Sequence, residues 1–210
     1  MTAEALRNAI RKLERSTTTP ELVRATTALC QLQDPGAVHA LIEVLGFNNP
    51  AVAAIATEGL ISLGSDVVPT LLVSLDPRNY GARAWIVRVL AVLRDARGLD
   101  LLEEALSNDI APSVRRSATR GLATLDLSGT DEQEALDRCC TALTRASRDD
   151  EWVVRFAAAF GLEQRLKENR LNGLQVSTSR DCLHRLASSA EDVRVVRLRA
   201  QLALQRLHAG

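Results

Sequence analysis

The chain repeats a helical pattern about every 31 residues, and this repeat limits its possible folds more than any other feature. Each copy has a turn residue, a stretch rich in Ala, Val and Arg, and then a leucine. These landmark leucines are Leu29, Leu60, Leu90, Leu122, Leu162 and Leu204, spaced 31, 30, 32, 40 and 42 residues apart. Between the copies lie second amphipathic stretches such as "GAVHALIEVL" and "RGLDLLEEAL". Two helices per unit at this period predict an all-α solenoid of HEAT type, an alpha-alpha superhelix of about six helical hairpins.

The repeat pattern also suggests the domain organisation. At 210 residues the chain is long enough for one sizeable core, and we expect a single HEAT-repeat domain over 1–210. The approximate repeats are 1–33, 34–64, 65–94, 95–127, 128–167 and 168–210. Thr19-Pro20, Asp34-Pro35 and Asn49-Pro50 each place a side-chain acceptor before a proline, as at helix starts. The last two repeats are lengthened by "DLSGTDEQ" and "KENRLNGLQVSTSRD", and we expect the second insert to be a mobile loop.

Composition narrows the classes of protein that the chain can belong to. Hydrophobic residues make up 46% and aromatic residues only 3%, so we expect a core of Ala, Val, Leu and Ile. No apolar run approaches the roughly 20 residues that cross a bilayer, and the N-terminal stretch is charged. We therefore expect a cytoplasmic protein without membrane insertion. Basic and acidic residues balance at 26 each, which disfavours a nucleic-acid partner.

The chain lacks the common signatures of metal and nucleophilic chemistry. The four cysteines form neither a CxxC pair nor a zinc spacing, and we expect them to be small buried side chains. The three histidines are scattered, and no P-loop, HExxH or GxSxG occurs. We therefore expect no metal site and no complete catalytic centre of its own.

Arginine recurs at one phase of the repeat, seven residues before the landmark leucine. The four arginines are Arg83, Arg115, Arg155 and Arg197, and Asp76, Asp109, Asp150 and Asp192 stand five to seven residues before them. In stacked hairpins such an arginine commonly bonds a carboxylate in the preceding turn or the neighbouring repeat. We interpret Arg115, Arg155 and Arg197 first as structural, with ligand binding as the alternative.

The third and fourth repeats carry more arginine and aromatic residues than this account requires. The segment "NYGARAWIVRVL" adds Tyr80, Trp85 and Arg88 around Arg83, and the next repeat adds Arg116 and Arg120. Because the second helices of a solenoid line one face, we expect these groups to converge on a groove. A second cluster, "DDEWVVRFAAAF", sets Trp152 beside an acidic turn. Carboxylates, arginine and aromatic rings together suit a flat ligand with acid and N–H groups.

Three of these segments carry a resemblance to a known family. "NYGARAWIVRVLAVLRDARGLDLLEEA", "DIAPSVRRSATRGLA" and "DDEWVVRFAAAFGL" resemble the F-type subunit of the E/F phycobilin lyases of cyanobacteria and red algae, over most of residues 20–165. The resemblance implies a carbon–sulfur lyase active as a heterodimer with an E-type HEAT-repeat partner. Such a pair attaches a phycobilin, here phycocyanobilin or else phycoerythrobilin, to a cysteine of the phycocyanin alpha subunit through a thioether. Family members can also remove or transfer the chromophore.

The resemblance also implies roles for particular residues. A bilin has two propionates, which call for arginine, pyrrole N–H groups, which call for carboxylates, and rings that call for aromatic side chains. The expected bilin-binding residues are Tyr80, Arg83, Trp85, Arg88, Arg115, Arg116, Arg120, Trp152 and Arg155. Asp109 or Asp150 is expected to help protonate the pyrroles. The nucleophile belongs to the acceptor, so the bilin is a substrate and no prosthetic group is expected.

The sequence agrees less well with three other functions. Related isomerising lyases carry a His-Cys pair where Tyr80 and Gly81 stand here, so bilin isomerisation is not expected. A non-catalytic HEAT-repeat adaptor, such as a phycobiliprotein chaperone or a phycobilisome degradation factor, is the main alternative. An arginine-lined HEAT protein acting on DNA is disfavoured by the neutral charge and by having only two lysines, Lys12 and Lys167.

Overall fold

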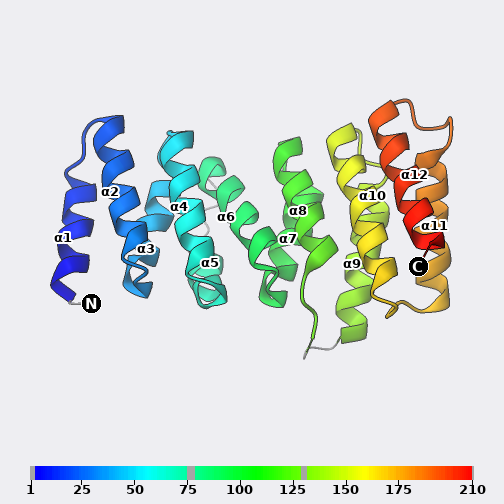
Figure 1. Cartoon of the computed structure of the whole chain (residues 1–210), viewed down its shortest axis with the longest axis horizontal. Helices are drawn as coiled ribbons and strands as arrows, with labels where there is room; N and C mark the ends of the chain where they lie inside the picture. Colours follow the sequence, from blue (N-terminus) through cyan, green and yellow to red (C-terminus); the bar gives the residue numbers. More distant parts are fainter. Residues whose placement is uncertain (1–2, 75–78, 129–131, 210) are drawn as a thin grey trace. The chain divides into compact units, whose positions relative to one another are not determined.

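The computed structural model describes residues 3–74, 79–128 and 132–209, and the elements named in these ranges are all helices (Figure 1). They are α1 (Ala3–Glu14), α2 (Thr19–Gln31), η1 (Pro35–Ala37), α3 (Val38–Leu45), α4 (Pro50–Ser62), η2 (Ser65–Val67), α5 (Val68–Val73), α6 (Tyr80–Leu93), η3 (Ala96–Gly98), α7 (Leu99–Asn108), α8 (Pro112–Thr124), α9 (Glu132–Ala146), α10 (Trp152–Lys167), α11 (Gly173–Ala187) and α12 (Arg194–His208). The all-α prediction is confirmed, and every landmark leucine lies in a second helix of the repeat.

The chain folds as two compact units, Met1–Leu93 and Arg94–Gly210. In the first unit, α1 packs on α2 and α3 packs on α4, while α2, α4 and α6 pack against one another in chain order. Leu29, Leu41 and Leu60 are fully buried at these contacts. Burial of such side chains drives the packing, because removing the apolar surface of one leucine from water stabilises the fold by roughly 2 kcal/mol. The single continuous domain stays a prediction.

The second unit is built from the hairpins α7–α8, α9–α10 and α11–α12. Its second helices α8, α10 and α12 pack in series around a core that includes Leu143, Leu162 and Val196. Gly161 permits the close approach of α10, because a Cβ there would lie 2.6 Å from Leu143 Cδ2 and 2.9 Å from Ala123 Cβ. The helix of the fifth repeat therefore depends on glycine at this position.

Two of the three predicted helix caps are confirmed. Asn49 caps α4, since its Oδ1 accepts a hydrogen bond from the amide of Val52 at 3.3 Å. Asp34 caps η1 in the same way. The prediction for Thr19 is wrong, because the cap of α2 is Thr18, which forms a capping box with Glu21. The reciprocal bonds of a capping box satisfy two amides, which a cap one residue later would not do.

The expected mobile loop in the sixth repeat is also wrong over most of its length. Asn172 and Gln175 form a capping box that starts α11 at Gly173, so residues 173–181 are helical. The polar composition concealed the apolar face on which this helix packs, which includes Cys182 and Leu183.

The second helices of the first three repeats end with the same backbone geometry. Gln33, Gly64 and Arg94 each follow their landmark leucine by four residues, with φ values of 50°, 78° and 59°. A left-handed residue at this place ends a helix and turns the chain. The shared position explains why the loops to the following 3-10 helices are short.

No single described helix is long and apolar enough to cross a membrane. The helix α4 and the segment Ser65–Val73 together have the length and apolar composition of a membrane span, but the chain bends by 108° between them. Val52, Ala53 and Leu60 of α4 are buried within the first unit.

Candidate functional site

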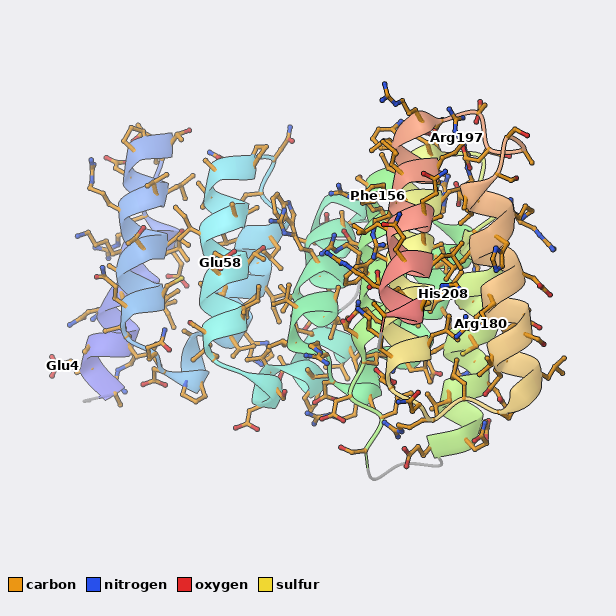
Figure 2. The ribbon with its side chains drawn as sticks, turned by 45° about the vertical axis from the view of Figure 1, so that its right-hand side comes forward. Glu4, Glu58, Phe156, Arg180, Arg197 and His208 are labelled. Atoms are coloured by element: carbon orange, nitrogen blue, oxygen red, sulfur yellow. The ribbon has the colours of Figure 1, made fainter. Side chains whose placement is uncertain are left out.

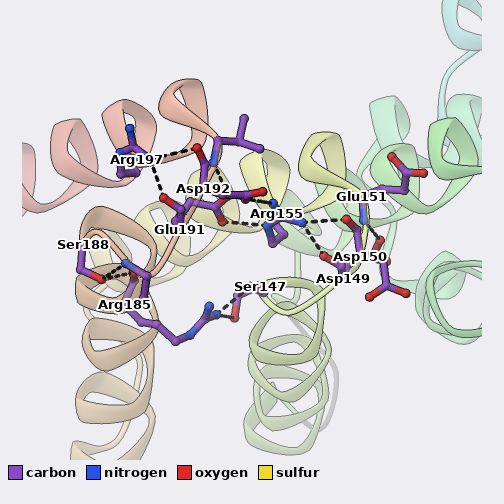
Figure 3. Close-up of polar contacts among 12 residues, drawn as sticks. Ser147, Asp149, Asp150, Glu151, Arg155, Arg185, Ser188, Glu191, Asp192 and Arg197 are labelled. Carbon is purple, nitrogen blue, oxygen red and sulfur yellow. Dashed lines mark hydrogen bonds and ion pairs between the residues drawn. The ribbon is translucent and has the colours of Figure 1, made fainter.

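The arginine at the shared phase joins successive hairpins of the second unit (Figure 3). Arg155 of α10 donates through Nε and Nη2 to Glu191 Oε2 and Oε1, both at 2.7 Å. Its Nη1 donates to the main-chain carbonyls of Asp149 at 2.9 Å and Asp150 at 2.8 Å. Arg197 of α12 donates likewise to the carbonyls of Glu191 at 2.5 Å and Asp192 at 3.0 Å. One guanidinium thus holds its own turn and the turn of the next hairpin.

Arg115 of α8 makes the corresponding contacts one repeat earlier. It donates to Asp149 Oδ2 at 2.8 Å and Oδ1 at 2.9 Å, and to the carbonyls of Asp109 and Ile110 at 3.0 and 3.2 Å. These hydrogen bonds to Asp149 raise the pKa of Arg115. Burial raises the pKa of Asp149, but the hydrogen bonds from Arg115 and from the amide of Glu151 outweigh it and hold that pKa below its usual value. We call Arg115, Arg155 and Arg197 with these partners the arginine ladder.

The structural interpretation is confirmed for these three arginines, since each bonds the carbonyl oxygens of its preceding turn. A carboxylate of the neighbouring repeat is bonded by Arg115 and Arg155, while the bonds of Arg197 reach carbonyl oxygens. The side chains of Arg115 and Arg155 are 16% and 13% exposed, and their donors are engaged within the protein. Binding of a bilin by Arg115 or Arg155 stays a prediction, one that competes with these bonds. Asp76 lies outside the described residues, and Arg83 is half-buried.

A cavity of about 650 Å³ lies beside the ladder in the second unit, between the end of α7 and the end of α9. The lining residues are Leu106, Ser107, Asn108, Asp109, Ile110, Arg115, Thr141, Thr144, Arg145, Ala146, Arg148, Asp149 and Asp150. It therefore brings both predicted catalytic carboxylates, Asp109 and Asp150, into one site. Asp109 Oδ1 accepts a hydrogen bond from the amide of Ala111 at 2.9 Å, which orients that carboxylate. The exposed carboxylate of Asp150 has no bonding partner among the described residues.

The cavity also contains two arginines that the sequence interpretation missed. Arg145 stands in the last turn of α9 and contacts the hydroxyl of Ser107, and Arg148 stands in the turn that follows the helix. Arg148 is exposed, and its side chain makes no hydrogen bond or ion pair with another described residue. The signal was present in "TRASRDD", where two arginines precede the acidic turn. Both arginines lie outside the second helices, where the repeated arginine phase occurs.

Aromatic and cationic side chains pair on α6 of the first unit. The guanidinium carbon of Arg88 lies 5.6 Å from the centroid of the Trp85 ring, within cation–π range. Trp85 is half-buried, Arg88 is exposed, and Tyr80 at the start of the helix is 69% exposed. The predicted convergence of α6 with α8 involves both units and stays a prediction.

In the second unit, the remaining predicted residues lie on α8 and α10. Arg116 and Arg120 of α8 are exposed, and Trp152 at the start of α10 is 44% exposed. The guanidinium of Arg120 lies 5.1 Å from the ring centroid of Phe160, and that of Arg199 from α12 lies 5.5 Å from the same centroid. Phe160 therefore joins three helices by cation–π contacts.

Comparison with known proteins places this arrangement in a family. Models of HEAT repeats match residues 68–163, and the PBS lyase HEAT-like repeat matches residues 22–47. The chain is 57% identical to the bilin biosynthesis protein RpcF of Synechococcus sp. WH8020, over 95% of this chain and 94% of that protein. It is 41% identical to the phycocyanin alpha phycocyanobilin lyase CpcF of Synechocystis sp. PCC 6803, over 76% of each. The chain belongs to the CpcF/RpcF family of phycobilin lyase subunits.

A solved structure agrees with this membership of the phycobilin lyase family. The complex of CpcE and CpcF of phycocyanin lyase from Nostoc sp. PCC 7120 contains a chain 41% identical to this one, with a TM-score of 0.72. The match covers 81% of this chain and 99% of that chain. The HEAT-type fold and the family resemblance are both confirmed.

The cysteines of this lyase-family chain are poorly suited to hold a bilin covalently. Cys139, Cys140 and Cys182 are buried, and Cys30 is half-buried with its Sγ 3.6 Å from the carbonyl of Ile55. Burial raises the pKa of Cys139 and of Cys140 to about 11, so at neutral pH both are thiols rather than nucleophilic thiolates. The prediction of a packing role is confirmed for the three buried cysteines. Within the described ranges, no three His, Cys, Asp or Glu side chains gather as metal ligands.

Proposed function

We propose that this chain is the F-type subunit of a heterodimeric bilin lyase. With an E-type subunit, it attaches phycocyanobilin to a cysteine of the phycocyanin alpha subunit through a thioether, and it can catalyse the reverse removal or transfer. The observation that carries the proposal is similarity to lyase subunits. Two proteins named phycocyanobilin lyase subunit beta are 42% and 40% identical over 88% and 94% of this chain, and a phycocyanin alpha phycocyanobilin lyase is 41% identical over 76%. The solved complex of CpcE with a chain 41% identical to this one supports the heterodimer.

The cavity supports the proposal through the chemistry of its side chains. In the reaction, the acceptor thiol adds across the ring A ethylidene, so that a C–S bond forms and the thiol proton ends on the conjugated system. No oxidant is needed. The exposed guanidinium of Arg148 suits a propionate, and the exposed carboxylate of Asp150 suits pyrrole N–H groups. Arg115 lies at the edge of the cavity, where it fixes the two turns that present these groups.

On this proposal the protein acts chiefly by holding the bilin in one orientation. Orienting a reactant beside its partner can lower a barrier by several kcal/mol without any nucleophile in the chain. The carboxylate of Asp150 assists by stabilising a proton on the pyrroles, which makes the ethylidene more electrophilic. The raised thiol pKa values agree with this division, because the attacking thiolate comes from the acceptor.

The choice of bilin is part of the proposal. The Synechocystis relative carries phycocyanobilin in its name, whereas the name of the more similar RpcF does not specify a bilin. Phycocyanobilin and phycoerythrobilin present the same propionates, so the cations of the cavity do not separate them. We propose phycocyanobilin, and parallel assays with the two bilins test it.

The test is coexpression of this chain with an E-type subunit, the apo-phycocyanin alpha subunit and enzymes that make the bilin. Denaturing electrophoresis with zinc-enhanced fluorescence then reports covalent pigment. We expect labelling that requires both subunits. Pigment that stays non-covalent, while a known lyase pair labels the same acceptor, refutes the lyase and favours an adaptor that only holds phycobiliproteins.

Variants of the cavity test its role within that assay. Asp150→Asn should lower the initial labelling rate by roughly 100-fold if the carboxylate assists proton transfer. Arg148→Ala should instead raise the bilin concentration needed for half-maximal rate. Asp66→Asn, an exposed aspartate of η2 in the first unit, is the matched control and should label at the wild-type rate. Wild-type rates in Asp150→Asn and Arg148→Ala would exclude this cavity as the bilin site.

A further inference from the structure

The last helix carries an exposed apolar stripe on one face. Val195, Leu198 and Leu202 of α12 are 42%, 51% and 38% exposed, and they follow one another by three and four residues. Figure 2 shows this helix between its labelled residues Arg197 and His208. We call these three side chains the α12 stripe. Three large apolar side chains on one helical face mark an interaction surface more strongly than scattered ones do.

The repeat register shows what this face does elsewhere in the second unit. Phe156 and Phe160 occupy in α10 the positions that Leu198 and Leu202 occupy in α12, six and two residues before the landmark leucine. Both phenylalanines pack against the core cluster to which α12 contributes. Arg120 holds the same position as Phe160 in α8, and it lies over the Phe160 ring of the next hairpin. These positions therefore face the following hairpin in the stack.

On α12 no described helix covers these positions. The helix α1 offers a contrast, because its exposed positions are mostly polar. They are Ala3, Glu4, Arg7, Asn8, Arg11, Lys12 and Glu14. A polar outer face is what a terminal capping helix of a repeat protein requires. The face of α1 fits such a cap, and the α12 stripe fits a surface that another helix covers.

The charges around the stripe restrict the kind of helix that fits. The helix α12 carries Arg194, Arg197, Arg199 and Arg206 and no carboxylate. Arg199 is bound to Glu163, whereas Arg194 is exposed with no partner among the described residues. A second copy of this chain that paired through its own α12 would bring the same cations to the contact, and the two sets would repel one another.

We propose that the α12 stripe is the docking surface for the E-type subunit, and that its occupant is an amphipathic helix with an apolar stripe flanked by carboxylates. The inference rests on the proposed function, which supplies the partner, and it goes further by naming the surface and the chemistry of the contact. The apolar contact supplies affinity, and Arg194 supplies charge complementarity.

The test measures the affinity of the purified full chain for the E-type subunit by isothermal titration calorimetry. Leu198→Glu should weaken binding by about 30-fold or more, as expected for a central apolar contact. Arg194→Glu should weaken it less and should remove part of its salt dependence. Leu174→Glu is the matched control, since Leu174 of α11 is 77% exposed in the same unit, and its affinity should equal that of the wild type.

A second measurement guards against a folding effect. Circular dichroism should give equal melting temperatures for Leu198→Glu and Leu174→Glu, because both side chains are exposed. A photo-crosslinking amino acid at position 198 should capture the E-type subunit, and the same amino acid at position 174 should not.

The outcomes separate this inference from the proposed function. Wild-type affinity in Leu198→Glu overturns the docking surface, and failure of the wild-type chain itself to bind the E-type subunit overturns the surface together with the proposed heterodimer. Self-association of the wild-type chain that Leu198→Glu abolishes, with E-type binding intact, assigns the stripe to a second copy and also overturns it. Binding that depends on Leu198 without covalent bilin attachment upholds the surface and refutes the lyase.

Discussion

Removal of the Arg155 guanidinium tests the arginine ladder most directly. Arg155→Ala leaves the carboxylate of Glu191, whose side chain is 2% exposed, with the amide of Val193 as its remaining donor. It also removes the donor from the carbonyls of Asp149 and Asp150. Removing one partner of a buried ion pair costs about 3–5 kcal/mol, because the other charge stays desolvated. Asp150 is exposed, so water can replace the lost donor at its carbonyl, and this carbonyl adds nothing to the expected loss of unfolding free energy.

We therefore expect Arg155→Ala to lower the free energy of unfolding by about 3–5 kcal/mol at pH 7. Urea titration followed by far-ultraviolet circular dichroism measures this, and the double variant with Glu191→Gln gives the coupling. The coupling should reach about 1.5–3 kcal/mol, since the two groups share two hydrogen bonds. Arg194→Ala, which removes an exposed arginine of α12, is the control and should change stability by less than about 0.5 kcal/mol.

A loss below about 1 kcal/mol in Arg155→Ala would refute this reasoning, because it is the value of a solvent-exposed ion pair. A large loss with no coupling to Glu191 would place the stabilisation in the carbonyl contacts alone. The first result would make Arg155 available again as a bilin ligand.

Three further predictions follow from packing and titration. Hydrogen bonds from Arg155 hold the pKa of Glu191 below its usual 4.5, so the stabilisation is present above pH 4.5 and is lost as pH falls through the lower folded-state value. Urea midpoints should therefore fall more steeply below pH 4.5 in the wild type than in Glu191→Gln, and parallel curves would contradict this. Gly161→Ala should cost about 1–3 kcal/mol of unfolding free energy, because the new methyl group meets Leu143. Gly173→Ala, with nothing within 4 Å of the added Cβ, is its control in the same urea titration. With the pKa of Cys139 and Cys140 raised to about 11, Ellman's reagent should label these two only after unfolding in urea, and rapid labelling of either in the native protein would contradict their burial.

The repeat phase made much of the fold predictable. A landmark leucine and an arginine seven residues before it both depend on local register, so they locate the second helices and the ladder. The capping box at Asn172 was readable too, but the polar residues around it outweighed its signal. The carboxylate acceptors could not be predicted from local register. Glu191 lies 36 residues from Arg155 in the sequence, and the two meet only when the hairpins stack.

The cavity shows the same division between local and long-range information. Asp109 and Asp150 were found because acidic turns recur with the repeat. Arg145 and Arg148 were missed because they lie in the last turn of α9 and just after it, outside the second helices, and enter the site only through the packing of one hairpin against the next. The contact of Phe160 with two arginines depends in the same way on the order of three helices.

The use of main-chain carbonyls in the ladder has a consequence for how such a chain can change. Every residue has a carbonyl, so the bonds from Arg115 to the turn before α8 place no demand on the side chains of Asp109 and Ile110. In the turn before α10, the bond from Arg155 to Asp150 likewise uses the main-chain carbonyl and not the side chain. Substitutions at Ile110 and Asp150 can therefore remodel the cavity and alter ligand preference while the hairpins stay joined, whereas Asp109 also bonds the amide of Ala111 through its side chain. A combinatorial library restricted to Ile110 and Asp150 should keep its thermal stability across variants that differ widely in what they bind.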